Sequence, residues 1–258
     1  MDTKYWGPSG WKLLHLIAQA DTLGGRKINR TFWESLPYVL PCKFCRASLT
    51  EYYENHPIPT KPADMGEWLY TIHNCVNDKL RSQGQNLPPN PPYQAVSIHY
   101  RELLSRDCTE TVFPGWEFLF CIADNYPGSA PSKPMPDTPG EALESARAGR
   151  LSMKERNRYN LLSTNQRITM LRRFMGALPA VLPFALWTGL WRRYCKKSFG
   201  GRSEAKRTLW CIRCAMDRAL HKKSETTYYG LCKELAAKRS GCSTARRART
   251  CRAPKKSA

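Results

Sequence analysis

The chain has 258 residues, 41% of them hydrophobic and 11% aromatic, and its 41 Lys and Arg against 21 Asp and Glu give a net charge of +20. This composition excludes a disordered chain and leaves room for one large domain or two of ordinary size. The positive charge favours acidic partners, including nucleic acid and anionic membranes, but says nothing about the fold.

The N-terminal segment MDTKYWGP lacks the apolar run of a secretory signal peptide. We therefore expect a chain that stays in a reducing compartment, where abundant cysteine indicates metal binding or redox catalysis. The chain has 11 cysteines, so at least one thiol stays unpaired if the others pair. They are Cys42, Cys45, Cys75, Cys108, Cys121, Cys195, Cys211, Cys214, Cys232, Cys242 and Cys251.

The first hundred residues are predicted to be all-α, because no alternating apolar and polar run suggests a sheet. Helices are expected over 9–20 with Ser9 as N-cap, over 30–39, over 42–55, and from a cap at Asp64 to about Gly84. The rigid NLPPNPP segment over 86–92 precedes a further helix over 93–106.

The remainder is predicted to contain a Pro-rich linker over 127–140 and a basic helical segment over 141–173. Residues 174–191 carry no charge, are flanked by Arg pairs, and have the minimum length for a membrane span. From 237 onward the tail is dense in Arg and Lys, which predicts a flexible basic end over 237–258.

Two stretches of the second half repeat stretches of the first, which indicates a diverged duplication. FMGALPAVLP from 174 matches FWESLPYVLP from 32 at six of ten positions, and GWEFLFCIA from 115 matches GWKLLHLIA from 10 at five of nine. We therefore predict a first domain over 1–107 and a degenerate helical copy over 108–236. Since the counterpart of 174–191 is a helix-turn segment, we do not expect it to span a membrane. In the second copy Cys42, Cys45, His73 and Asn74 are replaced by Phe184, Trp187, Ala215 and Met216.

The segment PCKFCR places Cys42 and Cys45 directly after Pro41, at the start of a predicted helix. A helix N-terminus favours the thiolate, which is the form that exchanges disulfides. A structural zinc site needs about four ligands at regular spacing, and the neighbouring His56 and Cys75 do not provide it. The pair is therefore predicted to be a redox-active disulfide, with no metal.

Two predicted helices present aromatic and polar side chains four residues apart, on one face each. Trp11 and His15 share a face of the first helix, and His73 and Asn77 share a face of the helix that follows Asp64. Such a lining suits a flat heterocyclic ligand. Each pair taken singly is also compatible with ordinary packing in a core.

Three motifs occur in order within eighty residues: WGPSGWKLLH, CKFCR with YY downstream, and WLYTIHNCVNDKL. Together they resemble the Erv/ALR family of FAD-linked sulfhydryl oxidases over residues 6–107. The extension by a second domain is similar to the members encoded by large DNA viruses. The spacing of Cys108 and Cys121 is shorter than that of the family's second cysteine pair, so they are not assigned to it, and Cys75 has no assigned role.

The resemblance implies a helical bundle that holds FAD at one end, with the Cys42–Cys45 disulfide against the isoalloxazine ring. Cys45 would be the flavin-proximal cysteine, in charge-transfer contact, and Cys42 the one that incoming thiols attack. Trp11 and His15 would contact the flavin and its adenosine part, with Pro8 at the turn before them. The residues expected to hold the adenine, ribose and phosphates are His73, Asn74, Asn77 and Lys79.

The implied enzyme is a flavin-linked thiol oxidase that converts 2 R-SH and O2 to R-S-S-R and H2O2. A substrate dithiol attacks Cys42, reduced Cys45 passes electrons to FAD, and dioxygen reoxidises the flavin. The implied partners are protein dithiols, such as thioredoxin-like carriers or virion proteins, dioxygen, and a second copy in a homodimer. The implied location is the host cytoplasm or the virion.

A further cysteine pair, Cys211 and Cys214, lies in the segment WCIRC. A thioredoxin-type motif needs a hydrophobic strand before it, and GGRSEAKRTL is not one. The pair is predicted to be a shuttle disulfide that relays electrons to Cys42, as distal pairs do in the family. A structural or reduced buried pair is an equal alternative, and another is a zinc site, with irregular spacing, from Cys211, Cys214, Cys232 and Cys242.

The alternative function is a basic nucleic-acid-binding virion protein in which the oxidase half is a relic. The Arg- and Lys-rich tail supports binding to phosphate groups. Against it, every motif residue named above is present in the first copy, and the second copy illustrates what loss of those residues looks like.

Overall fold

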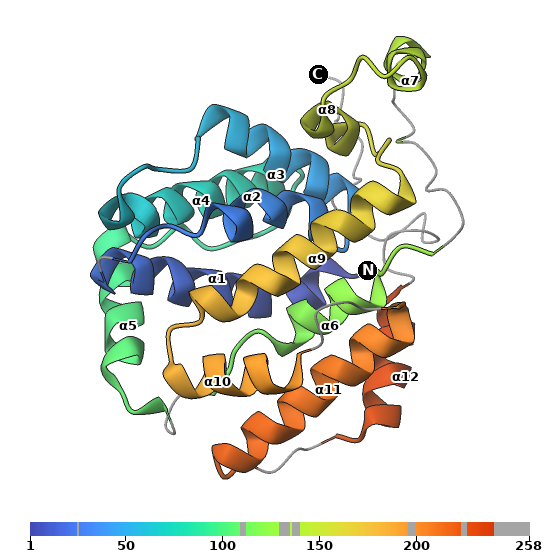
Figure 1. Ribbon diagram of the computed structural model, residues 1–258. Coiled ribbons are helices and arrows are strands. Elements are labelled where there is room, and N and C mark those ends of the chain that lie inside the picture. The colour runs from blue at the N-terminus through green and yellow to red at the C-terminus, as the bar shows by residue number, and fades with distance from the viewer. Residues whose placement is uncertain are drawn as a thin grey trace.

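The structure is a computed structural model that describes residues 1–24, 26–108, 112–128, 135, 140–195, 200–222 and 226–239. These residues contain helices and no strand, so the predicted all-α fold is confirmed (Figure 1). The first half contains α1 (Thr3–Gly24), α2 (Arg30–Val39), α3 (Lys43–Asn55), the 3-10 helix η1 (Pro62–Asp64), α4 (Met65–Ser82) and α5 (Tyr93–Ser105). The second half contains α6 (Trp116–Asp124), α7 (Gly140–Arg147), α8 (Met153–Arg158), α9 (Thr164–Val181), α10 (Ala185–Tyr194), α11 (Arg202–Ala219) and α12 (Tyr228–Lys238).

The helices of the first half lie close to where the sequence predicts them, with one difference at α1. This helix begins at Thr3 and not after Ser9, because Pro8 lies inside it and does not mark its first turn. Ser9 is buried instead of capping a helix: its hydroxyl donates to the Pro114 carbonyl at 2.8 Å and accepts from the Phe118 N–H at 3.3 Å. Ser9 therefore joins α1 to α6.

The predicted helical segment over 141–173 is wrong in detail, because the chain breaks twice within it. Gly149 and Asn160 have φ angles of +76° and +56°, in the left-handed region that ends helices. Ser152 and Ser163 then start α8 and α9 with capping boxes, in which each side chain accepts from a backbone N–H three residues later.

The uncharged stretch over 174–191 is divided between the end of α9 and most of α10, with a break at Leu182. Among the described residues, no helix combines the length and the apolar character that crossing a bilayer requires. Most of the predicted linker over 127–140 lies outside the described residues, and so do Cys242, Cys251 and the tail from 240 onward.

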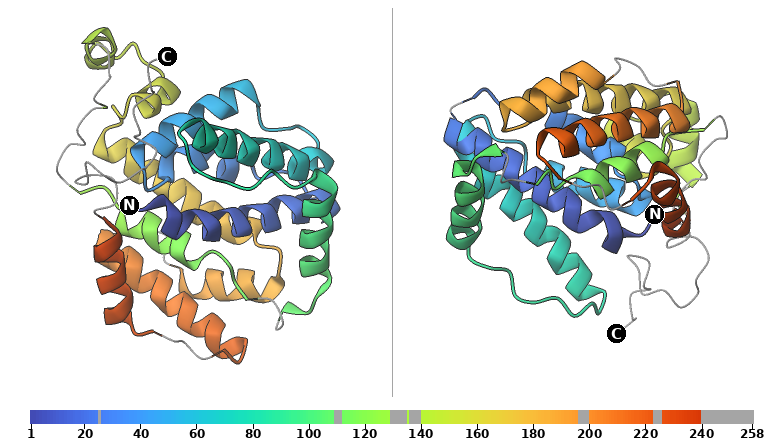
Figure 2. Two further views of the ribbon diagram at one scale, coloured as in Figure 1. Left: turned by 180° about the vertical axis from the view of Figure 1, so that it is seen from behind. Right: turned by 90° about the horizontal axis from the view of Figure 1, so that it is seen from below.

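The packing of the helices repeats between the halves (Figures 1 and 2). In the first half α4 packs on α1 and α3 on α2; in the second half α11 packs on α6 and α10 on α9. The halves meet through equivalent helices, α1 with α6 and α2 with α9. Their buried side chains form one continuous hydrophobic core that crosses the predicted boundary at 107.

Contacts between equivalent residues indicate that the halves are related by an approximate two-fold axis. Phe32 of α2 stacks on its counterpart Phe174 of α9 with 5.0 Å between ring centroids. A Cβ on Gly10 would lie 3.1 Å from the Phe118 ring, and one on the equivalent Gly115 would lie 2.5 Å from the side chain of Leu13. Reciprocal contacts of this kind are the mark of an isologous interface, here formed within one chain.

Candidate active site

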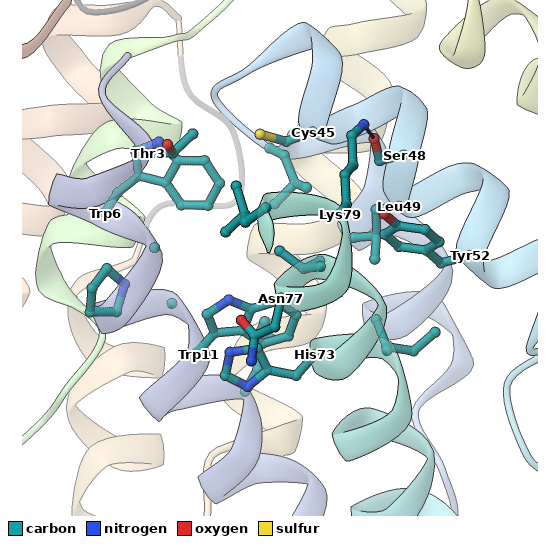
Figure 3. Close-up of a pocket in the computed structure, with 18 of the residues that line it drawn as sticks. Thr3, Trp6, Trp11, Cys45, Ser48, Leu49, Tyr52, His73, Asn77 and Lys79 are labelled. Atoms are coloured by element: carbon teal, nitrogen blue, oxygen red, sulfur yellow. Dashed lines mark hydrogen bonds between the residues drawn. The ribbon is translucent and has the colours of Figure 1, made fainter. Parts of the chain in front are cut away.

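The two cysteines of the CKFC motif begin α3, as predicted. Cys42 is the N-cap residue, with extended backbone angles (φ −105°, ψ 127°), and Cys45 lies in the first helical turn. Their burial differs: Cys42 exposes 3% of its surface, whereas Cys45 is half-buried and faces a cavity (Figure 3). The unpaired N–H groups at this helix end favour negative charge on both sulfurs.

The cavity has a volume of about 910 Å³ and lies between α1, α3 and α4. This volume is at the upper end of the range of roughly 300–1,000 Å³ for ligand and cofactor sites. Cys45, Ser48, Leu49 and Tyr52 form its α3 wall, since their spacing of three and four residues places them on one face. Figure 3 shows Cys45 at one end and Trp11 with His73 at the other.

Four aromatic rings lie together at the α1–α4 side of the cavity. Trp11 and His73 lie face to face, with 4.0 Å between ring centroids and 12° between planes. Behind them the Nε2 atom of His15 lies 3.0 Å from Nδ1 of His73, and the Tyr100 ring of α5 stacks on His15 at 5.2 Å. The stack presents a flat, preformed aromatic surface to the cavity.

Burial keeps both imidazoles neutral. It lowers the pKa of His15 to about 3, with a smaller contribution from repulsion by His73, and lowers the pKa of His73 to about 4. At neutral pH the two rings can therefore share a neutral hydrogen bond, in which one nitrogen donates and the other accepts. The polar end of the cavity is thus uncharged at this point.

Positive charge lies elsewhere on the cavity wall. Lys79 of α4 donates a short hydrogen bond to the hydroxyl of Ser48 on α3 (Figure 3). Lys4 and Lys12 line the cavity from α1. Asn77 also lines the cavity and donates to the amide oxygen of Asn90 at 2.9 Å. The wall therefore offers cations as well as a stacking surface.

The model of the Erv1 / Alr family matches residues 8–90. A FAD-linked sulfhydryl oxidase of African swine fever virus is 31% identical over 84 residues, which are 31% of this chain and 71% of that protein. The chain belongs to the Erv1/Alr family.

Other relatives match a similar length of the chain. A probable FAD-linked sulfhydryl oxidase of Acanthamoeba polyphaga mimivirus is 29% identical over 85 residues, covering 30% of this chain and 59% of the relative. The mitochondrial FAD-linked sulfhydryl oxidase of Saccharomyces cerevisiae is 31% identical over 85 residues, covering 31% of this chain and 45% of the relative. The chain thus spans only about half of the length of these two relatives. No solved structure matches the chain significantly.

The structure brings most of the residues expected from the Erv1/Alr resemblance to one cavity. Those that line it are Pro8, Trp11, Cys45, His73, Asn77 and Lys79. The other three stand back from the cavity wall: Cys42 is buried at the N-cap of α3, His15 lies behind His73, and Asn74 is half-buried on α4. Among the unassigned cysteines, Cys108 and Cys121 are not bonded to each other.

Sequence reasoning missed Lys4, Lys12 and Ser48. Lys4, Pro8 and Lys12 repeat every four residues and so share a face of α1, but this face exists only if the helix begins at Thr3. Ser48 could have been found from its spacing of three residues after Cys45.

The predicted shuttle pair lies far from this site. Cys211 is exposed and Cys214 half-buried, both in the middle of α11, and burial raises the pKa of the Cys214 thiol. In Figure 1, α11 is on the opposite side of the molecule from α3. Direct exchange with Cys42 would therefore have to come from another chain or follow a large movement.

Proposed function

We propose that the chain is a FAD-dependent sulfhydryl oxidase that converts protein dithiols to disulfides and dioxygen to hydrogen peroxide. The observation that carries the proposal is the position of Cys45, a member of a CxxC pair at a helix start, in the wall of a cavity of about 910 Å³ with a flat aromatic surface. The relatives named above are FAD-linked sulfhydryl oxidases or probable ones, which supports the same function.

The residues present fit FAD. The Trp11–His73 stack suits a planar ring system, and both imidazoles stay neutral at pH 7, so they add no charge beside it. Lys4, Lys12 and Lys79 supply the positive charge that a diphosphate requires. Apolar side chains form much of the rest of the wall; they include Leu36, Leu40, Leu49, Leu69, Ile72 and Val76.

The protein's own steps are thiol–disulfide exchanges. A substrate thiolate attacks the Cys42 sulfur of the Cys42–Cys45 disulfide; a new S–S bond forms, the old one breaks, and Cys45 leaves as a thiolate. The second substrate thiol then attacks the mixed disulfide, and Cys42 leaves in turn. FAD, when bound, supplies the two-electron chemistry that returns the dithiol to the disulfide and reduces O2 to H2O2.

The burial of Cys42 limits which thiols can reach it. A side chain that exposes 3% of its surface is accessible to a small dithiol or a thin, flexible segment more readily than to a cysteine on a rigid surface. We infer that a carrier with a mobile dithiol is the better protein substrate. Cys211 and Cys214 lie within the packed helix α11, so the shuttle role predicted from the sequence would require this helix to open locally in another chain.

The test is a measurement of flavin and oxygen in the purified protein. A flavin absorbance spectrum with one FAD per chain, together with dithiol-dependent O2 consumption and H2O2 release, is expected. A colourless protein that still fails to consume O2 after addition of FAD would contradict the proposal. Two FAD per chain would contradict the assignment of the second half as a degenerate copy.

The predicted homodimer, cellular location and nucleic-acid binding rest on the sequence alone. The homodimer, the location in the cytoplasm or virion, and nucleic-acid binding by the basic tail stay predictions, and that tail lies outside the described residues after Arg239. If the tail binds phosphate, removal of residues 240–258 should abolish salt-dependent binding to DNA without changing the oxidase rate. Equal binding by the truncated protein would exclude the tail.

A further inference from the structure

A guanidinium group is buried beside the redox-active cysteines. Arg46 follows Cys45 in α3 and exposes 4% of its surface. Its Nη1 atom donates to the Leu40 carbonyl at 3.0 Å, and its Nη2 atom donates to the side-chain oxygen of Asn160 at 2.6 Å. Both acceptors are neutral, although a buried cation normally has an anionic partner.

The groups that attract this cation are the two cysteines. Within the described part of the chain no carboxylate forms an ion pair with Arg46. Burial and, to a lesser extent, the guanidinium of Arg167 on α9 lower the pKa of Arg46 to about 9, whereas the Cys42 and Cys45 sulfurs raise it. The attraction is mutual, so the same charge favours the thiolate form of either sulfur.

Asn160, which holds the guanidinium, comes from the other half of the chain, in the turn after α8. Its φ of +56° is one that Asn adopts more readily than most residues. The fully buried Asn157 fixes the same turn against the first half, donating to the hydroxyl of Thr50 at 2.9 Å and to the carbonyl of Pro37 at 3.2 Å. The second half therefore supplies Asn160, which we call the clamp because it holds the guanidinium, and α3 supplies the cation.

We propose that Asn160 is a positioning residue that holds Arg46 beside the Cys42–Cys45 pair, where the guanidinium stabilises the thiolate that leaves during exchange. This role deepens the proposed oxidase function and rests on it. When a substrate thiolate forms its S–S bond to Cys42, the electron pair of the broken bond goes to Cys45. The negative charge that forms on the pair then lies near a fixed cation and not only in low-dielectric protein.

The repeat supports this role, because the copy that lost the cysteines also lost the cation. At the offset that aligns Cys42 with Phe184 and Cys45 with Trp187, the counterpart of Arg46 is Thr188. If the arginine served only to join helices, the second half could have kept it at position 188 even after losing the cysteines. The second half instead retains the clamp that serves the first.

The experiment measures the ionisation of each thiol in the reduced full-length protein. Iodoacetamide alkylation is followed from pH 5 to 11 by mass spectrometry, and trypsin cleavage after Lys43 separates Cys42 from Cys45. Because only the thiolate reacts, Arg46→Met should lower the rate at pH 7 about tenfold for the more acidic thiol, for a pKa rise of about one unit. The rates should converge with wild type above pH 10. Arg46→Lys, which keeps a cation, should restore part of the rate.

Asn160→Gly tests the clamp with less risk to folding, since Gly accepts the positive φ. We expect a rate loss of about threefold at pH 7, with the same convergence at high pH. The matched control is Arg158→Gln, which removes an exposed cation from the same α8–α3 contact, 3.9 Å from Glu54, and should leave both profiles unchanged.

Folded Arg46→Met and Asn160→Gly proteins with wild-type alkylation profiles would overturn the proposal. If Arg46→Met does not fold, the Asn160→Gly profile decides. The measurement needs neither FAD nor O2, so a protein without oxidase activity would refute the proposed function while the thiol profiles would still report on Arg46.

Discussion

Equivalent positions in the two halves carry side chains of opposite kinds. His15 of α1 contacts His73 behind the cavity, whereas its counterpart in α6, Phe120, is fully buried. Cys45 of α3 lines the cavity, whereas Trp187 of α10 is fully buried. The helices thus pack alike while one half keeps a ligand-sized space and the other fills it with aromatic side chains.

Stability and ligand binding therefore make opposite demands on the same bundle. Trp191 replaces the cavity-lining Leu49 and is also fully buried, with Phe113 packed against both Trp191 and Trp187. A buried Trp stabilises a core by roughly 3–5 kcal/mol relative to Ala. The first half lacks that packing and so leaves room for a ligand. The densely packed second half stabilises the first half through the shared core.

The largest expected effect on turnover comes from removing a cysteine of the CxxC pair, which only the first half has. Cys45→Ser should reduce dithiol-dependent O2 consumption to the background rate while FAD stays bound, because the serine hydroxyl cannot form the disulfide. Absorbance and O2 uptake check this. Cys75→Ser on α4, outside the CxxC pair, is the matched control and should retain turnover. Unchanged turnover in Cys45→Ser would show that the CxxC pair is not what distinguishes the function of the two halves.

The second prediction introduces the second half's packing into the first. Leu49→Trp copies Trp191 and should lower the FAD content of the purified protein by at least about tenfold, because the indole occupies the cavity, with a cost of about 1–3 kcal/mol from overpacking. Leu49→Met conserves volume and should bind FAD normally. Full FAD content in a folded Leu49→Trp protein would show that this wall does not contact the ligand.

The third prediction concerns pH. Because folding lowers the pKa of His15 to about 3, the unfolded chain binds more protons between pH 6.5 and 3. Stability is therefore fully present above pH 6.5 and falls as the pH drops below it. His15→Phe introduces the side chain of the counterpart Phe120. Between pH 7 and pH 5, the free energy of unfolding of this variant should fall by roughly 2 kcal/mol less than that of wild type.

Urea unfolding of wild type and variant at both pH values measures this difference. The exposed His99 of α5 gives the control, since His99→Phe should leave the pH dependence as in wild type. The same loss of stability in wild type and His15→Phe would mean that other groups cause it.

The smallest effect is expected for a feature that only the second half has. Cys211→Ala combined with Cys214→Ala should slow oxidation of a protein dithiol severalfold and leave the rate with DTT unchanged, since DTT needs no carrier to reach Cys42. Equal slowing with both substrates would indicate a structural role for the pair. Rates that match wild type with both would leave the pair without this function.

The sequence predicted local features of the fold well. The helix predicted over 42–55 is α3, with Cys42 as its N-cap, and α2 has the predicted bounds of 30–39. Local signals misplaced the start of α1, because they indicate Ser9 as its N-cap, whereas Ser9 lies inside the helix and its hydroxyl bonds to the segment around α6. The prediction of a helical segment over 141–173 was wrong at Gly149 and Asn160, because their positive φ angles interrupt the helix.

The candidate site was predictable where a motif spaces residues along one helix. Trp11, His73 and Cys45 belong to such motifs and do meet at one cavity. The burial of Arg46 was not predictable in this way, because it depends on Asn160, 114 residues further along the chain. A contact between halves is set by how helices pack in three dimensions, and no local spacing encodes it.

Because one polypeptide carries both halves, the contact between α2 and α9 does not depend on protein concentration. Two separate chains joined through the same surfaces would dissociate on dilution, since their stability depends on the concentration of protomers. A covalent connection instead gives the two surfaces an effective concentration that dilution does not lower. Asn160 therefore stays against Arg46 even when very few molecules are present, so this contact forms without a second copy of the chain.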